Sequence, residues 1–138
     1  MKIVIAGARV IGTYLAKLLS RNNEDITLID DDEDCLDNIS ANYDVLTLHD
    51  SPGSIKAMQT AGVQRCNLFI AVTGDQHVNL SSCSLAKALG AKRTVAKVED
   101  YEFADTANAE YLHRIGIDSI IYPELLGAKD IINGLKMS

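Results

Sequence analysis

Hydrophobic and polar residues follow two patterns that alternate along the chain. Short apolar runs are rich in β-branched residues, as in Lys2-Ile3-Val4-Ile5-Ala6, which is typical of a buried parallel strand. Longer segments carry apolar residues on one helical face, as with Ile11, Leu15 and Leu18. The two patterns recur about every 20 to 25 residues, which indicates repeated strand–helix–strand units.

The alternation predicts six strands and six helices. The strands are expected at residues 2–6, 25–30, 44–48, 68–72, 94–98 and 119–122. The helices are expected at residues 11–22, 32–41, 52–61, 76–89, 102–115 and 123–135. Such units form a parallel sheet with helices on both faces, and right-handed crossovers give the strand order 3-2-1-4-5-6. We therefore predict an α/β, doubly wound Rossmann fold in one domain, residues 1–138.

The charge balance narrows the set of partners. The 138 residues include 13 basic and 19 acidic ones, which gives a net charge of −6, and no basic stretch occurs. This balance argues against nucleic acids and anionic membrane surfaces as direct partners. No apolar run approaches the roughly 20 residues that span a bilayer, so we expect no direct membrane insertion. Any association with a membrane would then come through another protein.

The cysteines and histidines predict neither a metal site nor a nucleophile. The three cysteines lie far apart without metal-ligand spacing, and we expect reduced thiols of a cytosolic protein, buried as small hydrophobic residues: Cys35, Cys66 and Cys83. The three histidines have no neighbouring cysteine or carboxylate arranged as in a zinc site: His49, His77 and His113. His77 either borders a ligand cleft or lies on the surface.

The segment Gly7-Ala8-Arg9-Val10-Ile11-Gly12 joins the first strand to the first helix and nearly forms a dinucleotide-binding motif. In that motif the first glycine makes a tight turn, the second admits a pyrophosphate, and the third packs the helix on the sheet. Gly7 and Gly12 supply the first and third glycines, but Arg9 stands at the second position. The fold is therefore easier to predict than the ligand.

An acidic residue ends the second strand, at about the expected 20 residues after the glycine turn. The carboxylate of Asp30 can accept hydrogen bonds from both ribose hydroxyls of an adenosine and repels a 2′-phosphate. It therefore favours NAD, or an adenine nucleotide without a 2′-phosphate, over NADP. The alternative is a solvated acidic turn that caps the next helix, and Asp31 and Asp32 are expected to act as such caps.

The ends of the third and fourth strands supply further candidates, because ligands of such sheets bind outside the carboxyl ends of the strands. Asp50 either reaches the adenine edge or caps a helix that begins around Pro52. Thr73 and Gly74 are small enough to lie against a ribose or phosphate, and Asp75 is expected to cap the next helix.

A lysine ends the fifth strand. Lys97 either contacts a phosphate or forms a structural ion pair with Glu99 or Asp100. The last predicted helix carries an apolar stripe that either packs on the sheet or contacts a second copy of the chain: Leu125, Ala128, Ile132 and Leu135.

Short motifs spread over nearly the whole chain occur in a characteristic order and spacing. They are Gly7-Ala8 with Gly12, Leu28-Ile29-Asp30, Asp50-Ser51-Pro52, Ala61-Gly62-Val63, Leu68-Phe69-Ile70-Ala71-Val72-Thr73, Asn79, Ala86-Lys87, Val95-Ala96-Lys97-Val98, Gly116-Ile117-Asp118 and Tyr122-Pro123-Glu124. Together they resemble the TrkA N-terminal domain, also called the RCK or KTN domain, of bacterial Trk potassium-uptake regulatory subunits. The chain departs from the family at Arg9 and His49, where the family has glycine.

The resemblance implies a cytoplasmic regulatory domain of a potassium-uptake system. It implies a homo-oligomer (dimer or tetramer) docked on an integral-membrane potassium-translocating subunit at the inner membrane, with NAD, NADH or ATP, ADP or AMP setting its conformation. The cofactor-binding residues that it implies are Gly7, Ala8, Arg9, Val10, Ile11, Gly12, Asp30, Asp50, Thr73, Gly74 and Lys97. Family members commonly continue into a C-terminal domain, so we expect this chain to be a fragment of a longer protein.

Position 9 separates the functional alternatives. A side chain there obstructs the close approach of a phosphate, and it strains the backbone if φ is positive; alternatively, the guanidinium of Arg9 binds phosphate directly. We expect weakened or altered nucleotide binding. The competing hypothesis is an interaction module with a vestigial nucleotide site. A third, an NAD-dependent oxidoreductase, is disfavoured because no acid–base residue or substrate domain is recognisable.

Overall fold

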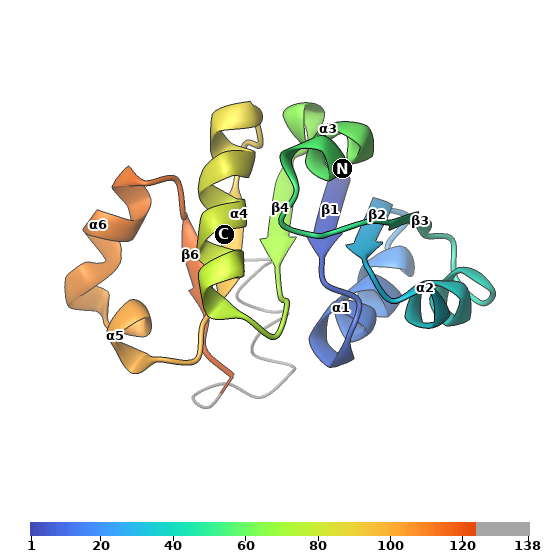
Figure 1. Cartoon of the computed structure of the whole chain (residues 1–138), viewed down its shortest axis with the longest axis horizontal. Coiled ribbons are helices and arrows are strands. Elements are labelled where there is room, and N and C mark those ends of the chain that lie inside the picture. Colours follow the sequence, from blue (N-terminus) through green and yellow to red (C-terminus); the bar gives the residue numbers. More distant parts are fainter. Residues whose placement is uncertain (124–138) are drawn as a thin grey trace.

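The six predicted strands form one parallel sheet in a computed structural model that describes residues 1–123. The strands are β1 (Lys2–Ala6), β2 (Asp25–Asp30), β3 (Leu46–His49), β4 (Leu68–Ala71), β5 (Thr94–Lys97) and β6 (Ser119–Ile121). Their order is β3-β2-β1-β4-β5-β6, and every neighbouring pair is parallel (Figure 1). The predicted Rossmann topology is confirmed.

Helices cover both faces of the sheet. They are α1 (Val10–Ser20), α2 (Glu33–Ser40), α3 (Ile55–Ala61), α4 (Gln76–Leu89), α5 (Tyr101–Ala104) and α6 (Ala109–Arg114), with short 3-10 turns at Val63–Arg65 and Thr106–Asn108. α1 and α2 pack on one face, and α3 and α4 pack on the other, in front of the sheet in Figure 1. The change of face occurs where the chain crosses from β3 to β4, which makes β1 and β4 neighbours.

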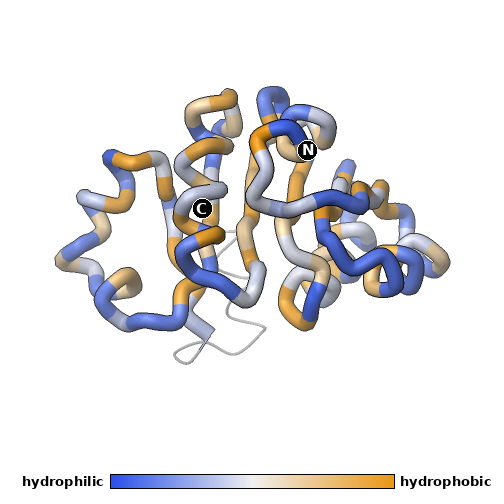
Figure 2. Tube along the Cα trace, in the orientation of Figure 1, coloured by the Kyte–Doolittle hydropathy of each residue, from blue (hydrophilic) through white to orange (hydrophobic). Residues whose placement is uncertain are grey.

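The central strands are buried on both sides. Ile3 and Ile5 of β1 face the helices α1 and α2, whereas Val4 and Ala6 face α3 and α4. In Figure 2 the central strands are coloured mostly as hydrophobic, whereas hydrophilic residues gather in the outer loops and helices. The edge strand β3 is more exposed, with Leu46 at 66%. Burial on both faces explains why the central strands read as continuous apolar runs.

Two predicted helices differ from the observed ones. The helix predicted at 52–61 begins at Ile55, because the side chain of Ser54 accepts the N–H of Ala57 and caps it there. The helix predicted at 102–115 is divided into α5, a 3-10 turn and α6, because Asp105 has an extended backbone and its carboxylate caps the turn. The helix predicted at 123–135, with its apolar stripe, lies outside the described residues.

All six strands end at the same edge of the sheet, called here the carboxyl edge, which lies toward the bottom of Figure 1. The loops that follow β1, β2, β3, β4 and β5 therefore meet there. Among residues 1–123, no helix is long and apolar enough to cross a membrane. The fold thus brings the candidate residues from five strand ends to one edge.

Candidate functional site

The turn between β1 and α1 depends on its first and third glycines. Gly7 has φ +110, and a Cβ there would lie 2.9 Å from the backbone nitrogen of Thr73. A Cβ on Gly12 would overlap the carbonyl oxygen of Gly7. The N–H of Gly7 donates to the carbonyl oxygen of Ile29 at 2.8 Å, which ties the turn to β2. Both glycines are therefore required by close backbone approach.

Arg9 adopts an ordinary extended backbone, with φ −74 and ψ −164, as the N-cap of α1. The strain that a positive φ would impose at this position is therefore absent. The exposed side chain makes no capping hydrogen bond, and the first turn of α1 has no acidic residue. The first N–H groups of an α-helix have no partner within the helix and carry partial positive charge. The start of α1 is thus suited to an anion.

Asp30 itself is buried, with 4% of its surface exposed, so its carboxylate is not part of a solvated turn. Its Oδ2 accepts the N–H of Ala8 at 2.6 Å, and its Oδ1 accepts the N–H of Asp32 at 2.8 Å. The carboxylate therefore braces the glycine turn against the end of β2. Each oxygen has a second lone pair that remains for another donor.

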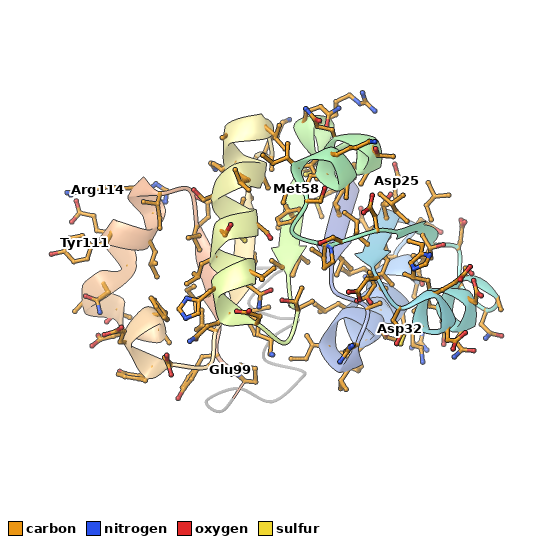
Figure 3. All side chains as sticks on the ribbon, viewed as in Figure 1. Asp25, Asp32, Met58, Glu99, Tyr111 and Arg114 are labelled. Atoms are coloured by element: carbon orange, nitrogen blue, oxygen red, sulfur yellow. The ribbon has the colours of Figure 1, made fainter. Side chains whose placement is uncertain are left out.

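Of the two acidic residues that follow Asp30, one caps α2 and the other does not. Asp32 caps α2 as predicted: its Oδ1 accepts the N–H of Cys35, and this hydrogen bond lowers the pKa of the Asp32 carboxyl. The predicted capping by Asp31 is wrong, because Asp32 holds that position. The carbonyl oxygen of Asp31 instead lies 3.0 Å from Nε2 of the exposed His49. Figure 3 shows Asp32 at this turn, toward the carboxyl edge.

The loop from β3 to α3 crosses in front of the sheet and approaches α4 (Figure 1). A Cβ on Gly53 would lie 3.2 Å from Cγ1 of Val78, which shows how closely the loop and α4 pack. Asp50 does not cap α3, since Ser54 does; its Oδ1 accepts the N–H of Ser51 at 2.7 Å. The alternative of a helix cap at Asp50 is therefore wrong.

The β4–α4 loop is held in two ways. Asp75 caps α4 as predicted, accepting the N–H groups of His77 and Val78. Thr73 donates its N–H and its hydroxyl to Oδ1 of Asn79, at 2.9 and 2.6 Å. Asn79, one turn into α4, therefore fixes the segment that follows β4.

These loops enclose a cleft of about 610 Å³ at the carboxyl edge, between the ends of β1 and β4. Of the predicted site residues, the cleft brings together Gly7, Arg9, Thr73 and Gly74. Sequence reasoning did not select the remaining lining residues as ligand contacts: Asp31, Ser51, Pro52, Gly53, Ser54, Asp75 and Val78. The residues of the β3–α3 loop could have been predicted from the sequence, because the turn-forming Ser51, Pro52 and Gly53 come shortly after the end of a strand.

The other predicted site residues, Asp30 and Asp50 among them, do not line the cleft. Ala8 and Gly12 are buried in the turn, Ile11 packs on the core, and Val10 is 86% exposed. Lys97 has its Nζ 3.8 Å from Oε1 of Glu99, which matches the ion-pair alternative. Glu99 lies toward the carboxyl edge in Figure 3.

The cysteines and histidines of the described residues form no metal site. Cys66 and Cys83 are buried, as predicted, and burial raises the pKa of Cys66 to about 11 and raises that of Cys83 further. Cys35 was also predicted to be buried, but it is only half-buried; a hydrogen bond with Asp32 raises the pKa of its thiol. His77 is exposed and lies edge-on to Phe103, so it does not border the cleft. These thiols are poor nucleophiles.

A second cleft, of about 640 Å³, lies between α1 and α2. It is lined by Thr13, Lys17, Cys35, Asn38, Ile39, Asn42 and Tyr43. The ammonium group of Lys17 lies over the ring of Tyr43, 5.6 Å from its centroid. None of the predicted ligand residues lies in this cleft.

Curated proteins similar to this chain are potassium-uptake proteins. A Trk system potassium uptake protein TrkA homolog of Archaeoglobus fulgidus is 37% identical over 130 residues, which cover 94% of this chain and 29% of that protein. A homolog of Methanothermobacter thermautotrophicus is 30% identical, over 93% of this chain and 57% of that protein. The chain thus spans between about a third and somewhat over half of these relatives.

Solved structures share the fold. The TrkA-N domain of the inner membrane protein ybaL from Escherichia coli matches with a TM-score of 0.75 and 13% identity, over 99% of this chain and 93% of that one. The GsuK channel bound to NAD matches with a TM-score of 0.70 and 19% identity, over 88% of this chain and 21% of that one. The profile of the TrkA-N domain matches residues 3–123. With its glycine turn, parallel sheet and this match, the chain belongs to the TrkA-N domain family.

Proposed function

We propose that this chain is the regulatory domain of a potassium-uptake system and that a nucleotide binds in the cleft between β1 and β4. The observation that carries the proposal is the position of this cleft. It lies between β1 and β4, where the strand order of the sheet reverses, and beside the uncapped start of α1. Family membership supports it, because relatives over most of this chain are Trk potassium uptake proteins.

The ligand is proposed to be NAD, NADH or an adenine nucleotide. Phosphates would meet the first N–H groups of α1, and Thr73 and Gly74 would form the opposite wall. A ribose would take the remaining lone pairs of Asp30, whose charge disfavours a 2′-phosphate. The GsuK channel, which shares this fold, has been solved with NAD and with ADP.

Regulation by a nucleotide requires that it bind two conformations with different affinity. We propose that these conformations act on an integral-membrane potassium-translocating subunit, with this domain as a homo-oligomer in the cytoplasm beside the inner membrane. We propose no catalytic role, because the related proteins are named for potassium uptake rather than for a reaction. The nucleotide would then act as an effector.

Calorimetric titration with ATP, ADP, AMP, NAD, NADH and NADP tests the proposal directly. We expect binding of at least one of the nucleotides that lack a 2′-phosphate, and weaker binding of NADP than of NAD. If the nucleotide affinity is the same in Thr73→Ala and Gly74→Val as in the wild-type protein, the ligand binds outside this cleft. Absence of binding by all six nucleotides would contradict the proposal.

Arg9 is proposed to alter this binding. Its backbone is unstrained, so any obstruction comes from the side chain that occupies the cleft wall. Because an extended backbone accommodates alanine, Arg9→Ala removes the guanidinium and keeps the Cβ, whereas Arg9→Gly removes both. The two variants therefore separate obstruction by the Cβ from an effect of the guanidinium.

An interaction module with a vestigial nucleotide site is the second candidate. Both carboxylate oxygens of Asp30 already accept a backbone N–H, and this favours a structural role for the residue that usually holds the ribose. Titration distinguishes the two candidates, because a vestigial site binds none of the nucleotides at physiological concentration.

A further inference from the structure

One buried amide side chain joins the wall of the cleft to the neighbouring strand. Asn79, on the first turns of α4, is 0% exposed. Its Oδ1 accepts the N–H and the hydroxyl of Thr73, at 2.9 and 2.6 Å. Its Nδ2 donates to the carbonyl oxygen of Thr73 at 3.1 Å and to that of Lys97 at 3.0 Å. Asn79 thus connects three elements: α4, the end of β4 and the end of β5.

The hydrogen-bonding capacity of this side chain is fully used. An asparagine amide has two N–H donors and one oxygen with two lone pairs, and each of the four finds a partner here. Both main-chain groups of Thr73 are bonded to the same planar amide, which fixes the orientation of the peptide that leads into Gly74. Loss of the amide would leave partly buried polar groups of Thr73 and Lys97 without this partner, which is costly where water cannot replace it.

Gln76, which precedes Asn79 by one turn, holds the next part of the β5 loop separately. Its Oε1 accepts the N–H groups of Glu99 and Asp100, at 2.9 and 3.0 Å, and its Nε2 donates to the carboxylate of Asp100 at 2.7 Å. The loop after Lys97 therefore has a tether that does not depend on Asn79. Thr73 has no such second side-chain tether from α4 among the described residues.

We propose that Asn79 is a positioning residue of the nucleotide cleft: it holds the Thr73–Gly74 wall at the distance from Gly7 and Arg9 that a bound nucleotide requires. This inference rests on the proposed function, because it concerns the same cleft. Asn79 does not line the cleft itself, and it acts through Thr73. Replacement of Asn79 therefore weakens binding by loosening the wall.

The test compares Asn79→Ala with a matched variant on the same helix. Cys83 lies one turn further along α4, is 0% exposed, and its thiol donates to the carbonyl oxygen of Val95, away from both loops. Cys83→Ala thus perturbs the same helix–sheet contact without touching Thr73. Asn79→Ser, which retains one donor and one acceptor on a shorter side chain, carries the test if Asn79→Ala does not fold.

Affinities for ADP and NAD are measured by calorimetry on variants that circular dichroism shows to be folded, and amide exchange is followed by NMR. We expect Asn79→Ala to weaken binding about tenfold or more, the equivalent of one or two lost hydrogen bonds, and Cys83→Ala to change it less than about threefold. In the ligand-free Asn79 variant, the amide of Thr73 exchanges faster, whereas those of Glu99 and Asp100 stay protected by Gln76.

Two results would contradict the positioning role of Asn79 without contradicting the proposed function. One is wild-type affinity in both Asn79 variants, and the other is an equal loss of affinity in Cys83→Ala, which would indicate general destabilisation. A wild-type protein that binds neither ADP nor NAD would contradict the proposed function, and the positioning role with it. The wild-type titration therefore separates the two failures.

Discussion

Replacement of Asp30 by alanine removes the acceptor that braces the glycine turn. The N–H of Ala8 is buried, and water cannot replace its 2.6 Å hydrogen bond to Asp30; the N–H of Asp32 is only partly buried and can be hydrated. A hydrogen bond to a charged group contributes about 1.5–3 kcal/mol, and a replaceable one about 0.5–1 kcal/mol. Removal of a buried carboxylate also removes the cost of burying it, which offsets part of the free energy lost with the two hydrogen bonds. We expect Asp30→Ala to lose about 2–3 kcal/mol of unfolding free energy.

Urea unfolding followed by circular dichroism measures this loss, with two variants for comparison. Asp31→Ala removes an adjacent, exposed carboxylate that accepts no hydrogen bond from the described residues, and we expect a change within about 0.5 kcal/mol. Asp30→Asn keeps one acceptor oxygen for Ala8 but turns an N–H toward Asp32, so its loss should lie between the two. The slope of the unfolding free energy against urea should be the same in all variants.

A loss below about 1 kcal/mol in Asp30→Ala would refute this account, because a buried N–H left without an acceptor costs at least that much. The carboxylate would then be dispensable for the turn, and ligand binding would be its main role. The opposite result, a large loss of stability, would mean that weakened nucleotide binding in Asp30 variants reports on the turn as well as on the ribose.

Gly12→Ala should cost more than about 3 kcal/mol in thermal unfolding, because its Cβ would overlap the oxygen of Gly7, whereas Gly74→Ala, with no atom within 4 Å of its Cβ, should stay within about 0.5 kcal/mol. Equal melting of the two variants would contradict the overlap. Burial opposes ionisation of Asp118, but its hydrogen bonds and nearby cations hold its pKa below the ordinary 3.8. Its contribution to stability is therefore present above about pH 4 and is lost as the pH falls further, and Asp118→Asn should flatten acid unfolding in that range. Arg9→Gly should tighten adenine-nucleotide binding about tenfold if the side chain obstructs the phosphate; weaker binding with a smaller salt dependence would show that the guanidinium holds the phosphate instead.

Local pattern in the sequence was sufficient to predict the architecture. The apolar runs of β1, β2 and β4 and the helical spacing between them reflect the burial of these central strands on both faces of a sheet. Right-handed crossovers, together with the glycine turn after the first strand, then favour the Rossmann strand order, and the structure has it. Gly7 and Gly12 were recognisable because two of their constraints are local to the turn: the positive φ of Gly7, and the approach of Gly12 to the carbonyl oxygen of Gly7.

Only the tertiary structure shows which groups the residues at the strand ends contact. The sequence offered Asp30 either to a ribose or to solvent, and only the fold shows its carboxylate accepting the N–H groups of Ala8 and Asp32. Likewise, the sign of φ at Arg9 depends on how the turn docks against β2 and β4, and residue type alone does not fix it.

The same limit applies to the cleft wall. Asn79 is one polar residue in a helical pattern, and its partners Thr73 and Lys97 lie 6 and 18 residues away. Hydrophobic periodicity records which face of an element is buried, but it carries no information on which distant carbonyl a buried amide meets. That pairing is set by the register of β4 against β5 and by the position of α4 on them, so only the assembled sheet reveals it.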